Sequence, residues 1–117
     1  MNTMKIARQR IIVVLVTCPS RAMAGRLARH LVSRRLAACA NILPGVMSLF
    51  WWKGAIDRCP ETLLLLKTTA AGFERLRRAV LALHPYDVPE IIALPVGAAH
   101  APYRRWVVSS VSPDSRT

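Results

Sequence analysis

The chain contains few of the residues that build glycine-rich phosphate loops, disulfide frameworks or zinc clusters. Glycine accounts for only 5 of its 117 residues, and neither a P-loop nor a GxGxxG fingerprint is present. The 3 cysteines are odd in number and form no CxxC pair, so neither a disulfide framework nor a structural zinc site is indicated. These absences favour a reducing compartment, and we expect the protein in the cytoplasm.

Acidic residues are scarce as well. There are 6 Asp and Glu against 17 Lys and Arg, which gives a formal net charge of +11. Such a charge attracts nucleic acids, acidic lipids and anionic metabolites without specificity. The glycine and aromatic pattern of a single-strand-binding sheet is missing. We therefore expect a solvated basic surface and no specific nucleic acid, with non-specific binding to nucleic acid or an anionic surface as an alternative function. Many basic residues fall on two predicted helices: Arg21, Arg26, Arg29, Arg34, Arg35, Arg75, Arg77 and Arg78.

Long hydrophobic runs are also missing. Three basic residues precede an apolar run within residues 5–16, as in a signal peptide, but the run at 11–16 is short and mostly β-branched, which is typical of a strand. No segment approaches the roughly 20 apolar residues of a membrane span. We therefore expect no membrane partner.

The composition is nevertheless apolar, with 53% hydrophobic residues and a mean hydropathy of +0.30. This is high for a small chain and indicates that a partner covers part of the surface. The length fits one domain. We predict a single domain over residues 10–111, between an N-terminal extension, residues 1–9, and a C-terminal tail, residues 112–117.

The first predicted elements are a strand and a helix. Ile11 to Val16 is a continuous β-branched run, as expected of a strand that is covered on both faces or central in a sheet. Ser20 follows Pro19 in a position to cap a helix. The apolar residues of that helix recur at helical spacing: Ala24, Leu27, Ala28, Leu31 and Val32.

A long hairpin is predicted next. Residues 39–52 form a strand that is interrupted at Pro44-Gly45, where a bend or bulge is expected. Lys53-Gly54 is a plausible two-residue turn. Residues 56–67 then read as the returning antiparallel strand, because the run of four leucines is too short for an isolated helix.

The remaining elements are a helix, a strand and a final helix. Thr69 can cap the second helix, which Pro85 stops, and residues 91–96 form the fourth strand. Pro102 begins the last helix. Its predicted apolar face consists of Tyr103, Trp106 and Val107.

The order is βαββαβ with a terminal helix, in the α+β class. Right-handed crossovers would give a ferredoxin-like sandwich with helices on one face. That fold by itself says little about function.

Several short motifs identify a family more specifically. They are Ala37-Ala38-Cys39-Ala40-Asn41-Ile42, Trp52-Lys53-Gly54, Lys67-Thr68-Thr69, His84-Pro85-Tyr86-Asp87-Val88-Pro89-Glu90-Ile91-Ile92, Leu94-Pro95-Val96 and Tyr103-x-x-Trp106. Together, in one order and with matching spacing from about Ile11 to Trp106, they resemble the CutA family of divalent-cation tolerance proteins. The resemblance implies a ferredoxin-like protomer in a tight homotrimer, related to PII-like proteins, with hairpin strands that pair across subunits.

The resemblance also implies a metal response. Family members are described as copper-binding through a cysteine on the first strand and a pair of histidines before Pro-Tyr. Here Val16 occupies the cysteine position and Leu83 that of the first histidine. This leaves His84 and Cys18 as the predicted metal residues, with copper(II) or another divalent cation as the ligand and none essential. The alternatives are a helix cap for His84 and a position past the strand end for Cys18.

A ligand cleft between subunits is the second expectation that the resemblance supplies. Lys67, Tyr86 and Glu90 match polar family residues near that cleft and could bind an anionic or polar ligand. The structural alternatives are a strand-end charge, a packed tyrosine with a bonded hydroxyl, and a salt-bridge partner. Trp52, also assigned to the cleft region, is expected to anchor a core or interface, and Cys39 to be a small core residue.

No set of nucleophile, base and orienting residue is recognisable. The first hypothesis is therefore a trimeric, non-catalytic metal-response protein. The alternative is a small-molecule binder or an enzyme that uses Lys67, Tyr86 and Glu90 in the cleft between subunits.

Overall fold

The computed structural model describes residues 9–112. Of the predicted extension and tail, all but Gln9 and Ser112 therefore lie outside the described residues. The elements follow the predicted order and give an α+β fold. They are β1 (Ile11–Cys18), α2 (Arg21–Ser33), β2 (Cys39–Trp52), β3 (Ala55–Thr69), α3 (Phe73–Leu83), β4 (Ile91–Pro95) and α4 (Ala101–Ser110).

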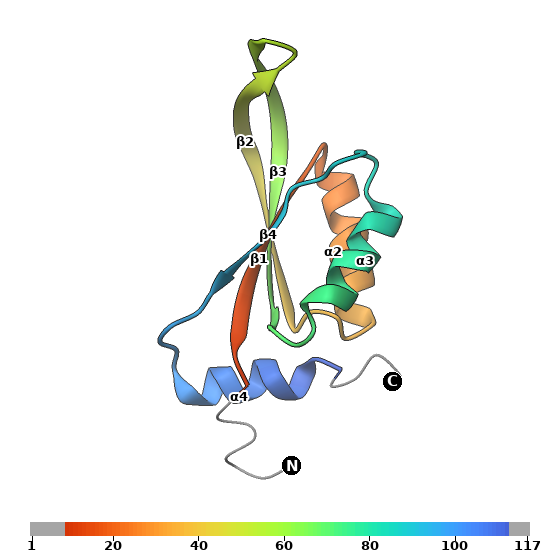
Figure 1. Cartoon of the computed structure of the whole chain (residues 1–117). Coiled ribbons are helices and arrows are strands. Elements are labelled where there is room, and N and C mark those ends of the chain that lie inside the picture. The colour runs from red at the N-terminus through yellow and green to blue at the C-terminus, as the bar shows by residue number, and fades with distance from the viewer. Residues whose placement is uncertain (1–8, 113–117) are drawn as a thin grey trace.

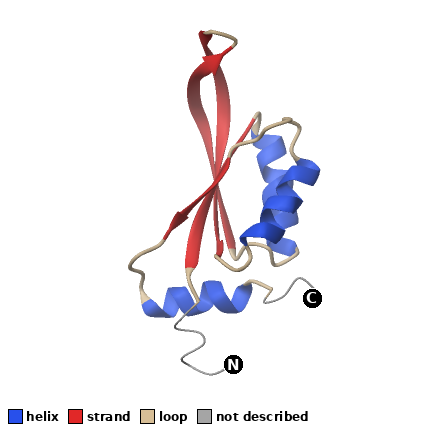
Figure 2. Ribbon diagram, in the orientation of Figure 1, coloured by secondary structure: helices blue, strands red, loops and turns tan. Residues whose placement is uncertain are grey.

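The four strands form one antiparallel sheet in the order β2-β3-β1-β4. Helices α2 and α3 lie side by side along one face of this sheet, as predicted (Figures 1 and 2). Alternate residues of the central strands point toward these helices, so their side chains form the core. The fully buried core side chains include Val14, Val16, Leu27, Leu31, Leu64, Leu66, Leu76 and Val80.

Helix α2 begins where the sequence predicts. The Ser20 hydroxyl accepts a hydrogen bond from the Met23 backbone N–H at 3.1 Å, which satisfies one of the free donors in the first turn. The buried residues of the helix recur at three- and four-residue spacing, so one face of α2 packs against the sheet.

The hairpin of β2 and β3 extends well beyond the rest of the sheet (Figure 1). Its register shifts between Leu43 and Val46, which is the predicted irregularity at Pro44-Gly45. The turn is also as predicted, because Lys53 and Gly54 both have positive φ, 51° and 80°, as a type I′ turn requires.

Helix α3 begins later than expected, and the assignment of Thr69 as its cap is wrong. Thr69 is the last residue of β3, and its hydroxyl accepts from the Gly72 backbone N–H at 3.1 Å. It therefore stabilises the turn between strand and helix, while Gly72 is the N-cap of α3.

Helix α4 lies across one end of the sheet rather than beside α2 and α3 (Figure 1). Its buried residues Val107 and Val108 pack with Ile11 and Val111. The predicted apolar face was therefore only partly correct, since Tyr103 is 39% and Trp106 46% exposed. Within residues 9–112, no helix is both long and apolar enough to cross a membrane.

Candidate functional site

His84 lies between the end of β1 and the loop that follows α3. The ring is buried, and its Nε2 is 2.8 Å from the carbonyl oxygen of Thr17. Since a carbonyl can only accept, Nε2 carries the hydrogen. Nδ1 in turn accepts from the Tyr86 backbone N–H at 3.2 Å. Both ring nitrogens are therefore occupied by bonds within the chain. His84 is the C-cap of α3 as the alternative had it, but the cap bond is made by its backbone N–H, and its ring bonds a carbonyl of β1 instead of one of the helix.

Cys18 lies inside β1, not past its end as expected. It is the last residue of the strand, opposite Thr62, and is fully buried on the same face as Val16. Burial, with a smaller contribution from the Glu61 carboxylate, raises the pKa of the Cys18 thiol to about 11. The thiolate, which is the metal-binding form, is disfavoured there.

These two environments bear directly on the predicted copper site. A histidine binds a metal through a free imidazole lone pair and a cysteine binds it as a thiolate, and neither is presented by His84 and Cys18 in this arrangement. Among the residues that the structure describes, no group of three or more His, Cys, Asp or Glu side chains could hold a metal ion. The predicted ligand pair of one chain does not fit a resident metal.

Tyr86 belongs to the same end of the sheet. Its hydroxyl donates to Glu61 Oε2 at 3.0 Å, and its ring centroid is 4.7 Å from that of His84. Burial first, and then Glu61, raises the pKa of Tyr86 to about 12. The hydroxyl thus acts as a hydrogen-bond donor. The sequence interpretation missed Glu61, although its alternation with Leu63 and Leu65 along β3 could have placed it on the face opposite the helices.

Lys67 lies in a second polar group, at the opposite end of the same face. It pairs with Cys39 on β2, and its Nζ donates to Asn41 Oδ1. The Cys39 thiol is 4.0 Å from the same amide oxygen. Tyr103 of α4 is next to Cys39, since burial and then Cys39 raise the pKa of its hydroxyl. The expectation that Cys39 is a core residue is therefore wrong, because it is only half-buried beside these polar groups.

One chain does not bring the four predicted cleft residues together. Lys67 is opposite Val13 of β1, whereas Glu90 precedes Ile91, which pairs with Val16. Trp52 ends β2 at the tip of the hairpin and is 59% exposed. Asn41 and Tyr103, which do contact or approach the Lys67 group, were not among the predicted site residues.

Between the two polar groups lies an apolar surface that no helix covers. Residues paired across antiparallel strands share a face, so the register places leucine, isoleucine and valine side chains in adjacent rows. Leu43 is 39%, Ile92 48% and Leu94 50% exposed. We call this surface the open face and define it by Val13, Leu15, Leu43, Leu63, Leu65, Ile92 and Leu94.

Comparison with known proteins gives consistent matches. The model of the CutA1 divalent ion tolerance protein family matches residues 12–110. The divalent-cation tolerance protein CutA of Thermus thermophilus is 48% identical over 95 residues, which cover 81% of this chain and 92% of that protein. The chloroplastic protein CutA 1 of Oryza sativa is 43% identical over 99 residues, 85% of this chain but only 56% of that protein.

Solved structures give the same result. The Thermus thermophilus structure superimposes with a TM-score of 0.86 at 45% identity, covering 87% of this chain and 99% of that chain. The Oryza sativa CutA1 crystal structure gives a TM-score of 0.88 at 41% identity, covering 90% of this chain and 96% of that chain. A structure from Archaeoglobus fulgidus, titled as a periplasmic divalent cation tolerance protein, gives a TM-score of 0.84 at 34% identity. The match covers 87% of this chain and 99% of that chain.

Proposed function

The chain belongs to the CutA1 divalent ion tolerance family, and from this membership we propose that it acts in divalent-cation tolerance as a homotrimer without catalysing a reaction. The observation that carries the proposal is the open face. Seven aliphatic side chains on one side of a sheet form a surface of the kind that monomeric proteins rarely leave in water. Each such side chain contributes about 1.5–3 kcal/mol when it is fully buried, so a second copy of the chain is the natural cover.

The hairpin supports assembly in the same way. Strand β2 is an edge of the sheet, and it carries Leu49, Trp51 and Trp52 with 66%, 75% and 59% of their surface exposed. An exposed, apolar edge strand is a template for pairing with another chain. Pairing between subunits would satisfy the backbone groups and bury the aromatic rings together.

We propose that no metal is resident in the protein and that the cation is cargo. Copper(II) prefers imidazole and thiolate ligands. His84 matches a family histidine, and Cys18 was the predicted substitute for the family cysteine, whose position Val16 occupies. Binding there would break two hydrogen bonds of His84 and ionise a thiol whose pKa is about 11. We therefore expect His84 and Cys18 to contribute nothing to metal uptake.

The test is native mass spectrometry of untagged, reduced protein with increasing Cu(II) or Zn(II). We expect trimers whose metal uptake is the same in the wild type and in His84→Ala. His100→Ala is the matched control, because His100 is an exposed N-cap with no side-chain hydrogen bond to its helix. Uptake in multiples of three that only His84→Ala abolishes would contradict this account and restore His84 as a ligand.

The absence of catalysis is proposed from the chemistry of the site. The relatives are named for tolerance of cations and not for a reaction. Burial keeps the Cys18 thiol protonated, and Tyr86, with a pKa of about 12, is no base at neutral pH. A cytoplasmic location is proposed because Cys18, Cys39 and Cys59 are all free thiols, as expected in a reducing compartment.

The alternative function, a small-molecule binder at a cleft between subunits, is supported by Lys67. Its ammonium group bonds a neutral amide, and Cys39 and Tyr103 add two further uncharged side chains. When the open face is covered, this charge needs an anion close by, because burying an unpaired ammonium is costly. A carboxylate or phosphate ligand, or Glu90 of a partner subunit, would supply one.

Lys67→Met tests this alternative. It keeps most of the apolar stem and removes the charge, so phosphate and citrate binding measured by calorimetry should be lost while the trimer persists. Arg105→Met, an exposed residue of α4, is the control for general charge. Equal loss in both variants would show non-specific attraction and remove the cleft as a site.

A further inference from the structure

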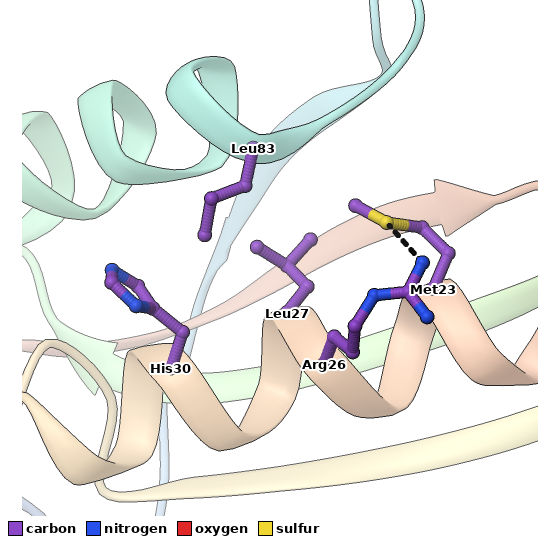
Figure 3. Close-up of a pocket in the computed structure, with 5 residues that line it drawn as sticks. All are labelled: Met23, Arg26, Leu27, His30 and Leu83. Atoms are coloured by element: carbon purple, nitrogen blue, oxygen red, sulfur yellow. Dashed lines mark hydrogen bonds between the residues drawn. The ribbon is translucent and has the colours of Figure 1, made fainter.

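A cavity of ≈ 180 Å³ opens between α2 and the C-terminal end of α3, on the side of the sheet away from the open face (Figure 3). Its lining comes mainly from α2. Met23, Arg26, Leu27 and His30 line one side, and Leu83 of α3 faces them. The cavity is half open to the surface, and all five lining residues belong to one chain.

The polar side chains that line this cavity lie on one face of α2, and each can donate hydrogen bonds. Arg26 and His30 are one turn apart and therefore neighbours on α2, and they flank Leu27 in Figure 3. Arg26 is an exposed residue, and within the lining its guanidinium reaches only a thioether, with Nη2 3.9 Å from Met23 Sδ. A thioether sulfur is a weak acceptor for a group with five donors.

No carboxylate neutralises Arg26 in this lining. None of the five residues is acidic, and the ion pairs found within residues 9–112 both use Glu74, at the opposite end of α3. A guanidinium fork matches the two oxygens of a carboxylate, and the His30 ring lies on the other side of Leu27 (Figure 3). Met23, Leu27 and Leu83 give the rest of the lining an apolar character.

We propose that this cavity binds a small organic anion, a carboxylate with a short aliphatic chain. The carboxylate would accept from Arg26, and the chain would lie against Met23, Leu27 and Leu83. The cavity is smaller than the roughly 300–1,000 Å³ of drug-sized ligand pockets, so the ligand is correspondingly small. A bare inorganic anion would leave the apolar lining unused.

Methyl NMR with ¹³C-labelled methionine tests the proposal on the intact protein. Met23 lines the cavity, whereas Met47 lies on β2 and serves as an internal control. Butyrate is the probe, with 1-butanol and inorganic phosphate as matched compounds that lack the charge or the chain. We expect a saturable shift of the Met23 methyl with butyrate. Binding should be about tenfold weaker for 1-butanol, which loses the charged hydrogen bond to Arg26, and about tenfold weaker for phosphate, which has no chain to cover the apolar lining.

Arg26→Gln should weaken butyrate about tenfold, because it removes the charge. Arg29→Gln is the matched control, an exposed arginine on the same helix that does not line the cavity, and it should leave butyrate binding unchanged. An unshifted Met47 methyl verifies that each variant is folded. Equal binding of butyrate and butanol, equal loss in the two arginine variants, or no saturable shift of Met23 would each overturn the proposal.

Discussion

His84 joins three parts of the chain. Its backbone N–H donates to Val80 at the end of α3, its ring Nε2 donates to Thr17 of β1, and its ring Nδ1 accepts from the backbone N–H of Tyr86. Tyr86 in turn reaches Glu61 on β3. A buried imidazole with two partners is a satisfied polar group, so the residue that the family resemblance marks as a ligand has a complete structural role in this chain.

Cys18 gives a testable pH dependence at the scale of single residues. Its pKa in the folded protein, about 11, lies above the ordinary value of 9.0. Below pH 9 the thiol is protonated in both states, and its contribution to stability is fully present. Between about pH 9 and 11 the unfolded thiol loses its proton while the folded one keeps it, so stability falls as the pH rises.

Urea unfolding at fixed subunit concentration measures this effect. The free energy of unfolding of the wild type should fall relative to that of Cys18→Ala across pH 9–11, under reducing conditions. Cys59→Ala, which removes a half-exposed thiol, should stay parallel to the wild type. Parallel curves for wild type and Cys18→Ala would contradict a buried, protonated thiol.

Single residues also show where prediction from sequence stops. Pro85 after an apolar helix was enough to predict a helix end at His84. The bond between Lys67 and Asn41 joins residues 26 positions apart and depends on the strand register, which no local pattern reveals. Cys18 was misjudged for a related reason, because only the pairing with Thr62 extends β1 that far.

The hairpin is the element whose local chemistry and structure agree best. Proline and glycine at 44–45 produced the register shift, and lysine and glycine at 53–54 produced the turn. By contrast, the start of α3 and the buried side of α4 depend on tertiary packing. Thr69 was drawn into β3 by pairing with Ile11, and α4 buries valines next to Ile11 instead of its aromatic residues.

Two glycines make a matched test of the hairpin turn and α2. Gly54 has a φ of +80°, so Gly54→Ala should destabilise the protein by about 1–2 kcal/mol. Gly25 lies inside α2 with nothing within 4 Å of an added Cβ, so Gly25→Ala should stabilise it by about 0.5–1 kcal/mol. Thermal unfolding of both variants beside the wild type checks the opposite signs. Shifts of the same sign would contradict the assigned backbone conformations.

At the scale of the whole molecule, the order of elements was enough to predict the sheet and the two covering helices. The apolar composition also indicated that some surface is covered. The composition could not show which surface, since strand residues of both faces are aliphatic, and only the register separates the core from the open face. The net charge of +11 has no assigned partner, and non-specific binding to a polyanion, with affinity that falls steeply with salt, stays a prediction.

Assembly through the open face is the central claim, and light scattering after size-exclusion chromatography tests it most directly. Leu65 lies within the open face, between Asn41 and Leu15 in register, so Leu65→Glu should place a charge in the interface. Leu81→Glu is the control, because Leu81 is 44% exposed on α3. The account predicts three copies for the wild type and Leu81→Glu, and a folded single copy for Leu65→Glu. A monomeric wild type, or a Leu65→Glu variant that still forms trimers, would contradict it.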